Sequence, residues 1–153
     1  SVDYDENAVK DSLEKVGLKE RLDKMPSGIQ TPLYKDFDED GVEISGGEAQ
    51  KIALARALYK DAPFVVLDEP TAALDPISEF EIYSKFNDIV GDKTAVFISH
   101  RLSSCRFCDD IAVFHEGELI QRGSHETLIT DKSGKYYELW NAQAQYYNEE
   151  SAS

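Results

Sequence analysis

Two short runs of apolar, β-prone residues separated by a helical segment constrain this sequence more than any other feature. Residues 64–67 and 94–98 each predict a strand, and neither run alternates with polar residues. Residues 76–90 lie between them with apolar positions spaced for a helix, which Gly91 ends. A strand, a crossover helix and a second strand predict an α/β fold. Both strands should be buried in a parallel sheet, with their carboxyl ends at one edge.

The remaining elements follow from helical periodicity and from turn residues. We expect two short helices over residues 5–25 that break at Gly17, a solvated loop over 26–43, a packed helix over 48–60, a hairpin over 111–114 and 118–121, a short helix opened by Ser124 and a last helix after Gly134. The loop includes an acidic run over residues 36–43.

The charge and the apolar runs exclude two kinds of partner for this segment. The chain has 30 Asp and Glu residues against 16 Lys and Arg, which gives a net charge of −14. It carries no basic stripe that could displace counterions from a phosphate backbone, so nucleic acid is not an expected partner. The apolar runs are far shorter than the roughly 18–20 residues of a membrane span, so we expect a soluble segment. The first residues contain no initiator Met and no signal peptide, which suggests an internal start.

The residues before the helix at 48–60 predict an anion site. Ser45 can cap that helix, while Gly46 and Gly47 let backbone N–H groups approach a ligand with no Cβ in the way. The positive end of the helix dipole adds to the attraction for an anion. An ordinary N-cap after a flexible loop would have the same residues, so this segment alone leaves both interpretations open.

Polar side chains follow each predicted strand. Asp68 stands at the carboxyl end of the first strand, where it can hold a hydrated Mg²⁺, and Glu69 can orient or deprotonate a water molecule. A solvated turn is the alternative, although acids directly after an apolar strand are costly to bury without a metal or ligand. His100 follows the second strand and suits either a hydrogen bond to a phosphoryl oxygen or a structural role.

Together these motifs resemble those of ATP-binding cassette (ABC) proteins. Their order and spacing are more specific than any one of them, since 68 − 45 = 23 residues separate Ser45 from Asp68 and 100 − 68 = 32 separate Asp68 from His100. Residues 44–48 resemble the signature motif, and residues 68–70 resemble the end of the Walker B strand with its catalytic Glu. Residues 72–75 resemble the D-loop, and residues 98–102 resemble the H-loop. Residues 39–41 are similar to the coupling segment of exporters, and residues 117–123 to their terminal hairpin.

The resemblance implies a role for each motif residue. By this resemblance Ser45, Gly46, Gly47 and Glu48 would contact the ATP bound to the opposite cassette. Asp68 would hold Mg²⁺ through water, and Glu69 would polarise the attacking water. His100 would contact the γ-phosphate, and Asp75 would cross the dimer interface. Glu48 stands where the family commonly has Gln, and Ala72 where the D-loop often has Ser.

The resemblance also implies the fold and the function. The implied fold is α/β, a partial P-loop NTPase (RecA-like) parallel-sheet core with part of the ABC helical subdomain. Residues 1–60 would be the helical subdomain portion, 61–132 the ATPase core from Walker B to the hairpin, and 133–153 a C-terminal helix and tail. The implied function is ATP binding and hydrolysis in an ABC exporter, with ATP and Mg²⁺ as cofactors. Its partners would be a second nucleotide-binding domain and transmembrane domains, at the cytoplasmic face of the membrane.

One family motif has no counterpart in these 153 residues. The Gly-x-x-x-x-Gly-Lys-Ser/Thr loop is absent, because the only Gly-Lys pair, Gly134-Lys135, is followed by Tyr136 and has no Gly five positions earlier. The adenine-stacking aromatic and the Gln loop of the family are missing as well. We therefore expect the C-terminal half of a cassette, inactive as an ATPase by itself. Uncovered apolar sheet surface should also make it poorly soluble.

Two other functions stay open at this stage. A soluble ABC ATPase of DNA repair or translation shares the motifs, although no long insertion interrupts residues 44–123 and the acidity disfavours nucleic acid. The other is a non-catalytic half-cassette that lends its signature to a partner. Tyr137, Trp140, Ala144 and Tyr147 roughly share one face of the last helix, where they could dock a partner or pack on their own domain.

The two cysteines suggest little chemistry. Cys105 and Cys108 form one Cys-x-x-Cys at helical spacing. A tetrahedral zinc site needs two further ligands, and His100 and His115 do not follow a zinc-finger spacing. We expect ordinary reduced thiols.

Overall fold

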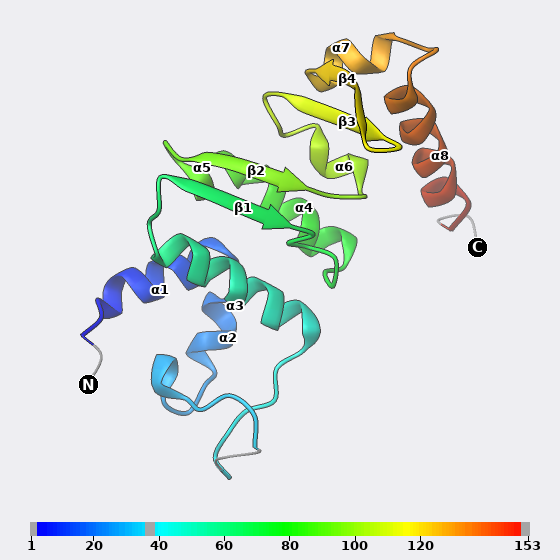
Figure 1. The fold of residues 1–153 in the computed structure, drawn as a ribbon. Coiled ribbons are helices and arrows are strands. Elements are labelled where there is room, and N and C mark those ends of the chain that lie inside the picture. Colours follow the sequence, from blue (N-terminus) through cyan, green and yellow to red (C-terminus); the bar gives the residue numbers. More distant parts are fainter. Residues whose placement is uncertain (1–2, 36–38, 151–153) are drawn as a thin grey trace. The chain divides into compact units, whose positions relative to one another are not determined.

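The computed structural model describes residues 3–35 and 39–150, with side chains through residue 145, and the predicted acidic loop over 36–43 therefore lies partly outside the described residues. The chain divides into two compact units, residues 1–98 and 99–153 (Figure 1). No helix in the described part of the chain is long and apolar enough to cross a membrane.

The first unit begins with three predicted helices, α1 (Glu6–Lys15), α2 (Lys19–Asp23) and α3 (Gly46–Tyr59). The segment expected to be a loop contains the short 3₁₀ helix η1 (Gly28–Gln30), which the sequence did not predict. The break between α1 and α2 falls at Gly17, whose φ of 76° is the left-handed conformation that glycine adopts without strain. Helix α1 lies beside α3 (Figure 1), and Val16, Leu54 and Ala55 are buried in this helical part.

A β–α–β unit follows, as the two apolar runs predict. Strands β1 (Phe64–Asp68) and β2 (Thr94–Ile98) pair in parallel, and the connecting chain forms α4 (Pro76–Ser84) and α5 (Phe86–Val90). The sequence predicted one helix over 76–90. The structure has two, because Lys85 leaves helical geometry with φ −105° and ψ 8°, although both helices bury apolar residues.

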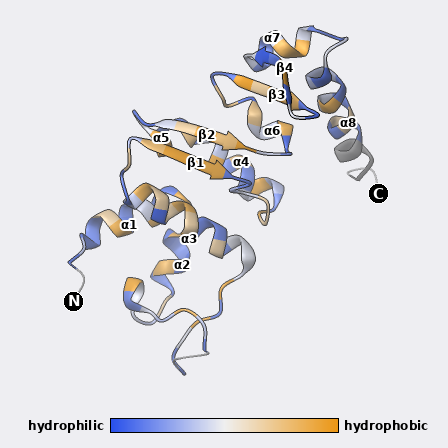
Figure 2. Ribbon diagram, in the orientation of Figure 1, coloured by the Kyte–Doolittle hydropathy of each residue, from blue (hydrophilic) through white to orange (hydrophobic). Residues whose placement is uncertain are grey.

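The parallel pair is covered on one face only within the described residues. On that face Phe97 packs edge-on against Tyr83 of α4, with ring centroids 5.3 Å apart, and against Phe86 of α5 at 5.8 Å. On the opposite face Phe64 is 53% exposed and Val66 is 56% exposed. The predicted burial of both faces is therefore wrong for this chain, because both helices of the crossover lie over the same face. Figure 2 shows β1 hydrophobic along most of its length.

The second unit contains the predicted hairpin and closing helices. Its elements are α6 (Leu102–Cys105), β3 (Ile111–His115), β4 (Glu118–Gly123), α7 (His125–Thr130) and α8 (Lys135–Glu150). The hairpin turns through Glu116 and Gly117, both at positive φ, and Ser124 caps α7 as predicted. These elements surround one small core.

That core also decides between two interpretations of the last helix. It consists of Leu102, Ile111, Val113, Leu128 and Tyr136. Trp140 packs against it, which favours packing of α8 on its own unit over an open docking stripe, whereas the side chain of Tyr147 lies outside the described residues. Cys105 and Cys108 form no disulfide within the described residues and pack against the same core, and burial raises the pKa of Cys108.

Candidate functional site

The predicted anion site lies at the N-terminus of α3, where Ser45 forms a reciprocal cap with Glu48. The Ser45 hydroxyl accepts a hydrogen bond from the Glu48 N–H at 3.1 Å, and the Glu48 carboxylate accepts one from the Ser45 N–H at 2.8 Å. This arrangement is a capping box, which satisfies two backbone donors at the start of the helix. The hydrogen bond from the Ser45 N–H is the main cause that lowers the pKa of Glu48, which therefore stays ionised at neutral pH.

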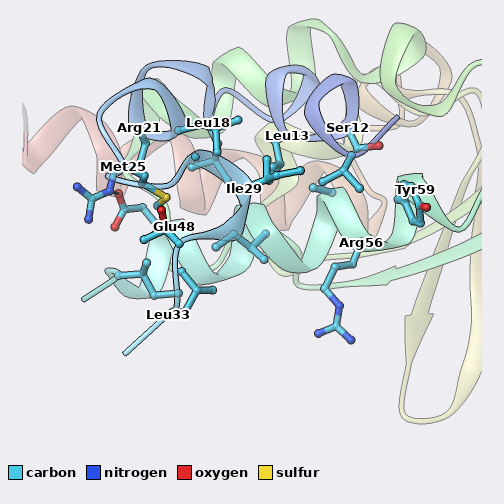
Figure 3. A pocket seen from close by; sticks show the side chains of 17 residues that line it. Ser12, Leu13, Leu18, Arg21, Met25, Ile29, Leu33, Glu48, Arg56 and Tyr59 are labelled. Carbon is cyan, nitrogen blue, oxygen red and sulfur yellow. Dashed lines mark ion pairs between the residues drawn. The ribbon is translucent and has the colours of Figure 1, made fainter. Parts of the chain in front are cut away.

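Arg21 of α2 holds the same segment from the other side. Its Nε forms a 2.9 Å ion pair with Glu48, drawn in Figure 3, and its Nη2 donates a 2.9 Å hydrogen bond to the Glu43 carbonyl. Arg21 thus bridges the two ends of the loop over residues 43–48 and offsets the charge of Glu48. The sequence did not predict this contact, because nothing in the helical periodicity of α2 indicates which segment it faces.

The two signature glycines allow α3 to lie directly against the segment that follows Glu69. A Cβ on Gly47 would stand 3.1 Å from Leu74 Cδ2 and 3.2 Å from the Ala73 carbonyl oxygen, whereas one on Gly46 would meet Ala73 Cβ at 3.8 Å. The first two distances are tighter than ordinary van der Waals contact and the last is not. Gly47 is therefore required for close packing at this point.

Gln50 joins the same two elements by hydrogen bonds. Its Nε2 donates to the Glu69 carbonyl at 3.3 Å, and its Oε1 accepts from the Ala73 N–H at 2.7 Å. Gln50 stands 50 − 46 = 4 residues after Gly46, so helical spacing places it on the same face of α3. That spacing is the signal that could have identified it from the sequence.

The paired carboxylates lie at the carboxyl end of β1, as predicted. Asp68 is the last strand residue and its side chain is exposed. Glu69 continues the ladder, because its N–H donates to the Ile98 carbonyl at 2.9 Å, and its φ of 45° then turns the chain out of the sheet. A left-handed conformation at a residue with a Cβ is strained, and such strain often occurs at functional positions.

A buried polar cluster fixes the turn after Glu69. Thr71 is 2% exposed, and its hydroxyl hydrogen-bonds to Glu79 at 2.9 Å and to the Tyr83 hydroxyl at 2.7 Å, both on α4. A buried hydroxyl with two partners resists displacement, since a lost partner would leave a polar group unsatisfied. The turn is therefore held on α4 at Thr71 and on α3 at Gln50.

Asp75 has a structural contact in addition to its predicted role. Its carboxylate caps α4 and accepts hydrogen bonds from the Ser78 N–H at 3.0 Å and the Ile77 N–H at 3.1 Å. These bonds, that from Ser78 first, lower the pKa of Asp75. The cap fixes the carboxylate at the end of the turn that starts at Glu69.

His100 belongs to the second unit, so its geometry is separate from that of the other site residues. Its side chain is exposed, and its backbone carbonyl accepts a hydrogen bond from the Gln143 amide of α8. The same amide accepts from the Leu102 N–H at 2.9 Å. The backbone around His100 is thus held by a glutamine, as the backbone around Glu69 is.

An apolar cavity of about 350 Å³ lies between α1, α2 and η1 on one side and α3 on the other (Figure 3). Leu13, Leu18 and Ile29 line it, and the Arg21–Glu48 pair stands at one end. It contains neither Asp68 nor Glu69, so it is distinct from the motif residues that suit phosphate chemistry. Among the described residues, no group of three or more His, Cys, Asp and Glu side chains could hold a metal ion without other ligands.

Comparison with known proteins matches this arrangement to one family. The family model for ABC transporters matches residues 4–72. The ATP-dependent lipid A-core flippase of Saccharophagus degradans is 40% identical over 139 residues, which are 91% of this chain and 23% of the flippase. The human mitochondrial iron-sulfur clusters transporter ABCB7 is 38% identical over 128 residues, 84% of this chain and 16% of that protein.

A solved structure agrees with the sequence relatives. The structure of a bacterial Atm1-family ABC exporter with ATP bound superposes with a TM-score of 0.81 at 31% identity, over 94% of this chain and 24% of that one. The chain belongs to the ABC transporter family, and the predicted partial P-loop NTPase fold is confirmed. It spans about a quarter or less of the length of these relatives.

Proposed function

We propose that this chain supplies the signature, Walker B and D-loop residues of the ATP-hydrolysing domain of an ABC exporter. The observation that carries the proposal is the close packing of the glycine-led N-terminus of α3 against the turn between Glu69 and Asp75. One rigid element then presents N–H donors for a phosphate, and the adjoining element presents carboxylates for water and metal. The exporter relatives support the direction of transport, and residues 1–60 act as part of the helical subdomain.

The residues of the chain divide the chemistry among them. The Ser45 hydroxyl and the N–H groups of Gly46 and Gly47 bind the γ-phosphate of an ATP held by a second nucleotide-binding domain, because a helix N-terminus attracts anions. Glu69 orients the attacking water and accepts its proton, which is the role of a general base. His100 donates a hydrogen bond to the γ-phosphate, and Asp75 contacts the second domain.

Asp68 fits a magnesium site of the kind that nucleotides complete. Its carboxylate is exposed at the end of β1, and no hydrogen bond or ion pair within the described residues occupies it. Mg²⁺ takes oxygen ligands and is commonly held by one or two carboxylates together with waters and substrate phosphates. When bound, the ion neutralises charge on the phosphoryl oxygens. Asp68 holds it through water and thereby fixes its place relative to Glu69.

The whole protein would act at a membrane. Two such domains close on ATP and drive transmembrane domains, at whose cytoplasmic face they lie. The 153 residues by themselves should not hydrolyse ATP, because they contain no phosphate loop with its Lys. The cargo depends on residues outside this chain.

The test is ATP turnover with Mg²⁺ by a purified polypeptide that joins these residues to a phosphate loop. Glu69→Gln should lower turnover at least about 100-fold, since general-base catalysis contributes about 10²–10⁴-fold. Glu81→Gln is the matched control, because Glu81 is an exposed acid on α4 away from the turn, and it should leave turnover unchanged. Equal turnover in wild type and Glu69→Gln would contradict the proposal. Turnover absent from both would favour the non-catalytic module instead.

A further inference from the structure

The side chain of Gln50, on α3, connects this helix to the turn that begins at Glu69. Its two polar atoms are both used, one as a donor to the Glu69 carbonyl and one as an acceptor from the Ala73 N–H. This pairing also fixes the orientation of the amide, since only the oxygen can accept and only the nitrogen can donate. No other side chain among the described residues is shown to bond to both of these backbone groups.

The turn needs this partner because its own hydrogen bonds leave a gap. The Ala72 N–H donates to the Glu69 carbonyl at 3.2 Å, and the Leu74 N–H donates to the Thr71 carbonyl at 2.9 Å. The Ala73 N–H lies between these two donors and bonds to Gln50 instead. Gln50 also binds the carbonyl of Glu69, the residue with the strained left-handed backbone.

Glycine packing shows independently that α3 and the turn form one body. A Cβ on Gly47 would crowd Leu74 Cδ2 and the Ala73 carbonyl oxygen, at 3.1 and 3.2 Å, and Gln50 lies on the same face of the helix. A shift of the N-terminus of α3 therefore has two routes to the turn, one through contact and one through hydrogen bonds. Neither route uses a titratable side chain.

We propose that Gln50 is a positioning residue. Its two hydrogen bonds fix the backbone of Glu69 and Ala73 in place relative to α3. The inference rests on the proposed function, in which the N-terminus of α3 binds a phosphate and Glu69 orients the attacking water. In a pair of such domains, the signature residues of one chain would contact one ATP, while Glu69 of the same chain would act at the other ATP. Gln50 would then couple phosphate binding at the first site to the position of Glu69 at the second. Gln50 itself touches neither nucleotide.

The first test does not depend on ATP hydrolysis. Hydrogen–deuterium exchange is followed in the complete polypeptide, without nucleotide, for the peptide that spans residues 69–74. Gln50→Ala should speed exchange at Ala73 about fivefold, the factor expected when one net hydrogen bond is lost. Gln50→Glu should protect Ala73, because a carboxylate oxygen still accepts from its N–H. Arg56→Ala, an exposed position on the same helix, is the control and should change nothing.

The second test separates positioning from folding. Gln50→Ala should lower kcat about tenfold with little change in KM, because a misplaced general base slows chemistry without weakening ATP binding. Gln50→Glu cannot donate to the Glu69 carbonyl when ionised but can when protonated. Its turnover relative to wild type should therefore rise as the pH falls, whereas a merely structural defect would give a constant ratio.

The outcomes distinguish this inference from the proposed function. Unchanged exchange over residues 69–74 in Gln50→Ala overturns the inference, and so does faster exchange with an unchanged kcat. A flat pH ratio for Gln50→Glu has the same consequence. If Glu69→Gln hydrolyses ATP as fast as wild type, the proposed function fails instead, while the exchange data still decide whether Gln50 holds the turn.

Discussion

The two units hold their candidate residues by the same device on different scaffolds. In the first unit the Gln50 amide bonds to the Glu69 carbonyl and the Ala73 N–H, and in the second the Gln143 amide bonds to the His100 carbonyl and the Leu102 N–H. Each loop begins at the end of a strand, beyond which the backbone groups need partners other than a neighbouring strand. A helix-borne amide supplies both a donor and an acceptor. Strands determine where such loops start, and single side chains determine their conformation.

The scaffolds differ in strand direction, but each covers only one face of its two strands. The second unit closes an antiparallel hairpin over a core in which Tyr136 is 1% exposed, whereas Phe114 and Leu119 of the hairpin are exposed. The first unit has a parallel pair with Phe64 and Val66 exposed. Antiparallel sheets commonly have one face toward solvent, whereas parallel sheets usually have both faces covered, so the open face is unusual only in the first unit.

The largest expected effect concerns the contact between α3 and the turn in the first unit. Gly47→Ala should destabilise this contact by about 1–3 kcal/mol, the usual cost of overpacking, because the new Cβ would meet Leu74 and the Ala73 carbonyl. Gly46→Ala is the matched variant and places its Cβ at an ordinary contact distance of 3.8 Å. Thermal unfolding of both variants measures the difference, and equal losses of stability would show that close packing is not the cause.

A smaller effect is expected in the core of the second unit. Tyr136→Phe removes the hydroxyl that hydrogen-bonds to His125 Nδ1 at 2.9 Å, and should cost about 1–2 kcal/mol because His125 loses this partner. Tyr137→Phe is the control, since Tyr137 is only half-buried. Chemical denaturation monitored by Trp140 fluorescence reports on this unit. A cost confined to Tyr136→Phe would support independent stability of its core.

Gln143, which bonds to two backbone groups of its loop as Gln50 does, offers a direct comparison. Gln143→Ala should destabilise the second unit by about 1 kcal/mol, the value of a typical net hydrogen bond. Hydrogen exchange should rise at Leu102 and stay unchanged over residues 69–74, since the partners of Gln143 among the described residues, Leu102 and His100, lie in its own unit. Faster exchange at both Leu102 and residues 69–74 would mean that the two glutamines do not act independently on their loops.

The sequence predicted the elements well and their partners poorly. Apolar periodicity located both parallel strands and the signature helix, and the cap at Ser45 followed from residue type. Periodicity reports which face of an element is apolar, but not which atoms lie opposite. For that reason Arg21 and Gln50 were missed, although Gln50 follows Gly46 at helical spacing. The apolar run of β1 predicts burial whatever covers it, whereas the absent phosphate loop led to the expectation of uncovered sheet surface, which the exposed Phe64 and Val66 match.

The smallest expected effect tests whether the charge on Glu48 matters to the loop it caps. The pKa of Glu48 is lowered in the folded chain, chiefly by the hydrogen bond from the Ser45 N–H, with Arg21 contributing further. A carboxyl with a depressed folded pKa stabilises the fold above its unfolded pKa of about 4.3, and this contribution disappears as the pH falls through the folded value. The capping box should therefore weaken only in acid.

Glu48→Gln removes that titration while keeping an oxygen that can accept from the Ser45 N–H. It should cost about 0.5 kcal/mol or less at neutral pH, because the lost ion pair with Arg21 is partly exposed, at 38% for Arg21 and 26% for Glu48. Unfolding measured against pH should then be less steep below about pH 4.5 than in wild type. Arg21→Ala should cost more at neutral pH than Glu48→Gln, since it also leaves the Glu43 carbonyl without its donor. If Arg21→Ala costs nothing in a Glu48→Gln background, the bond to Glu43 is not stabilising, and charge compensation alone explains the presence of Arg21 beside this loop.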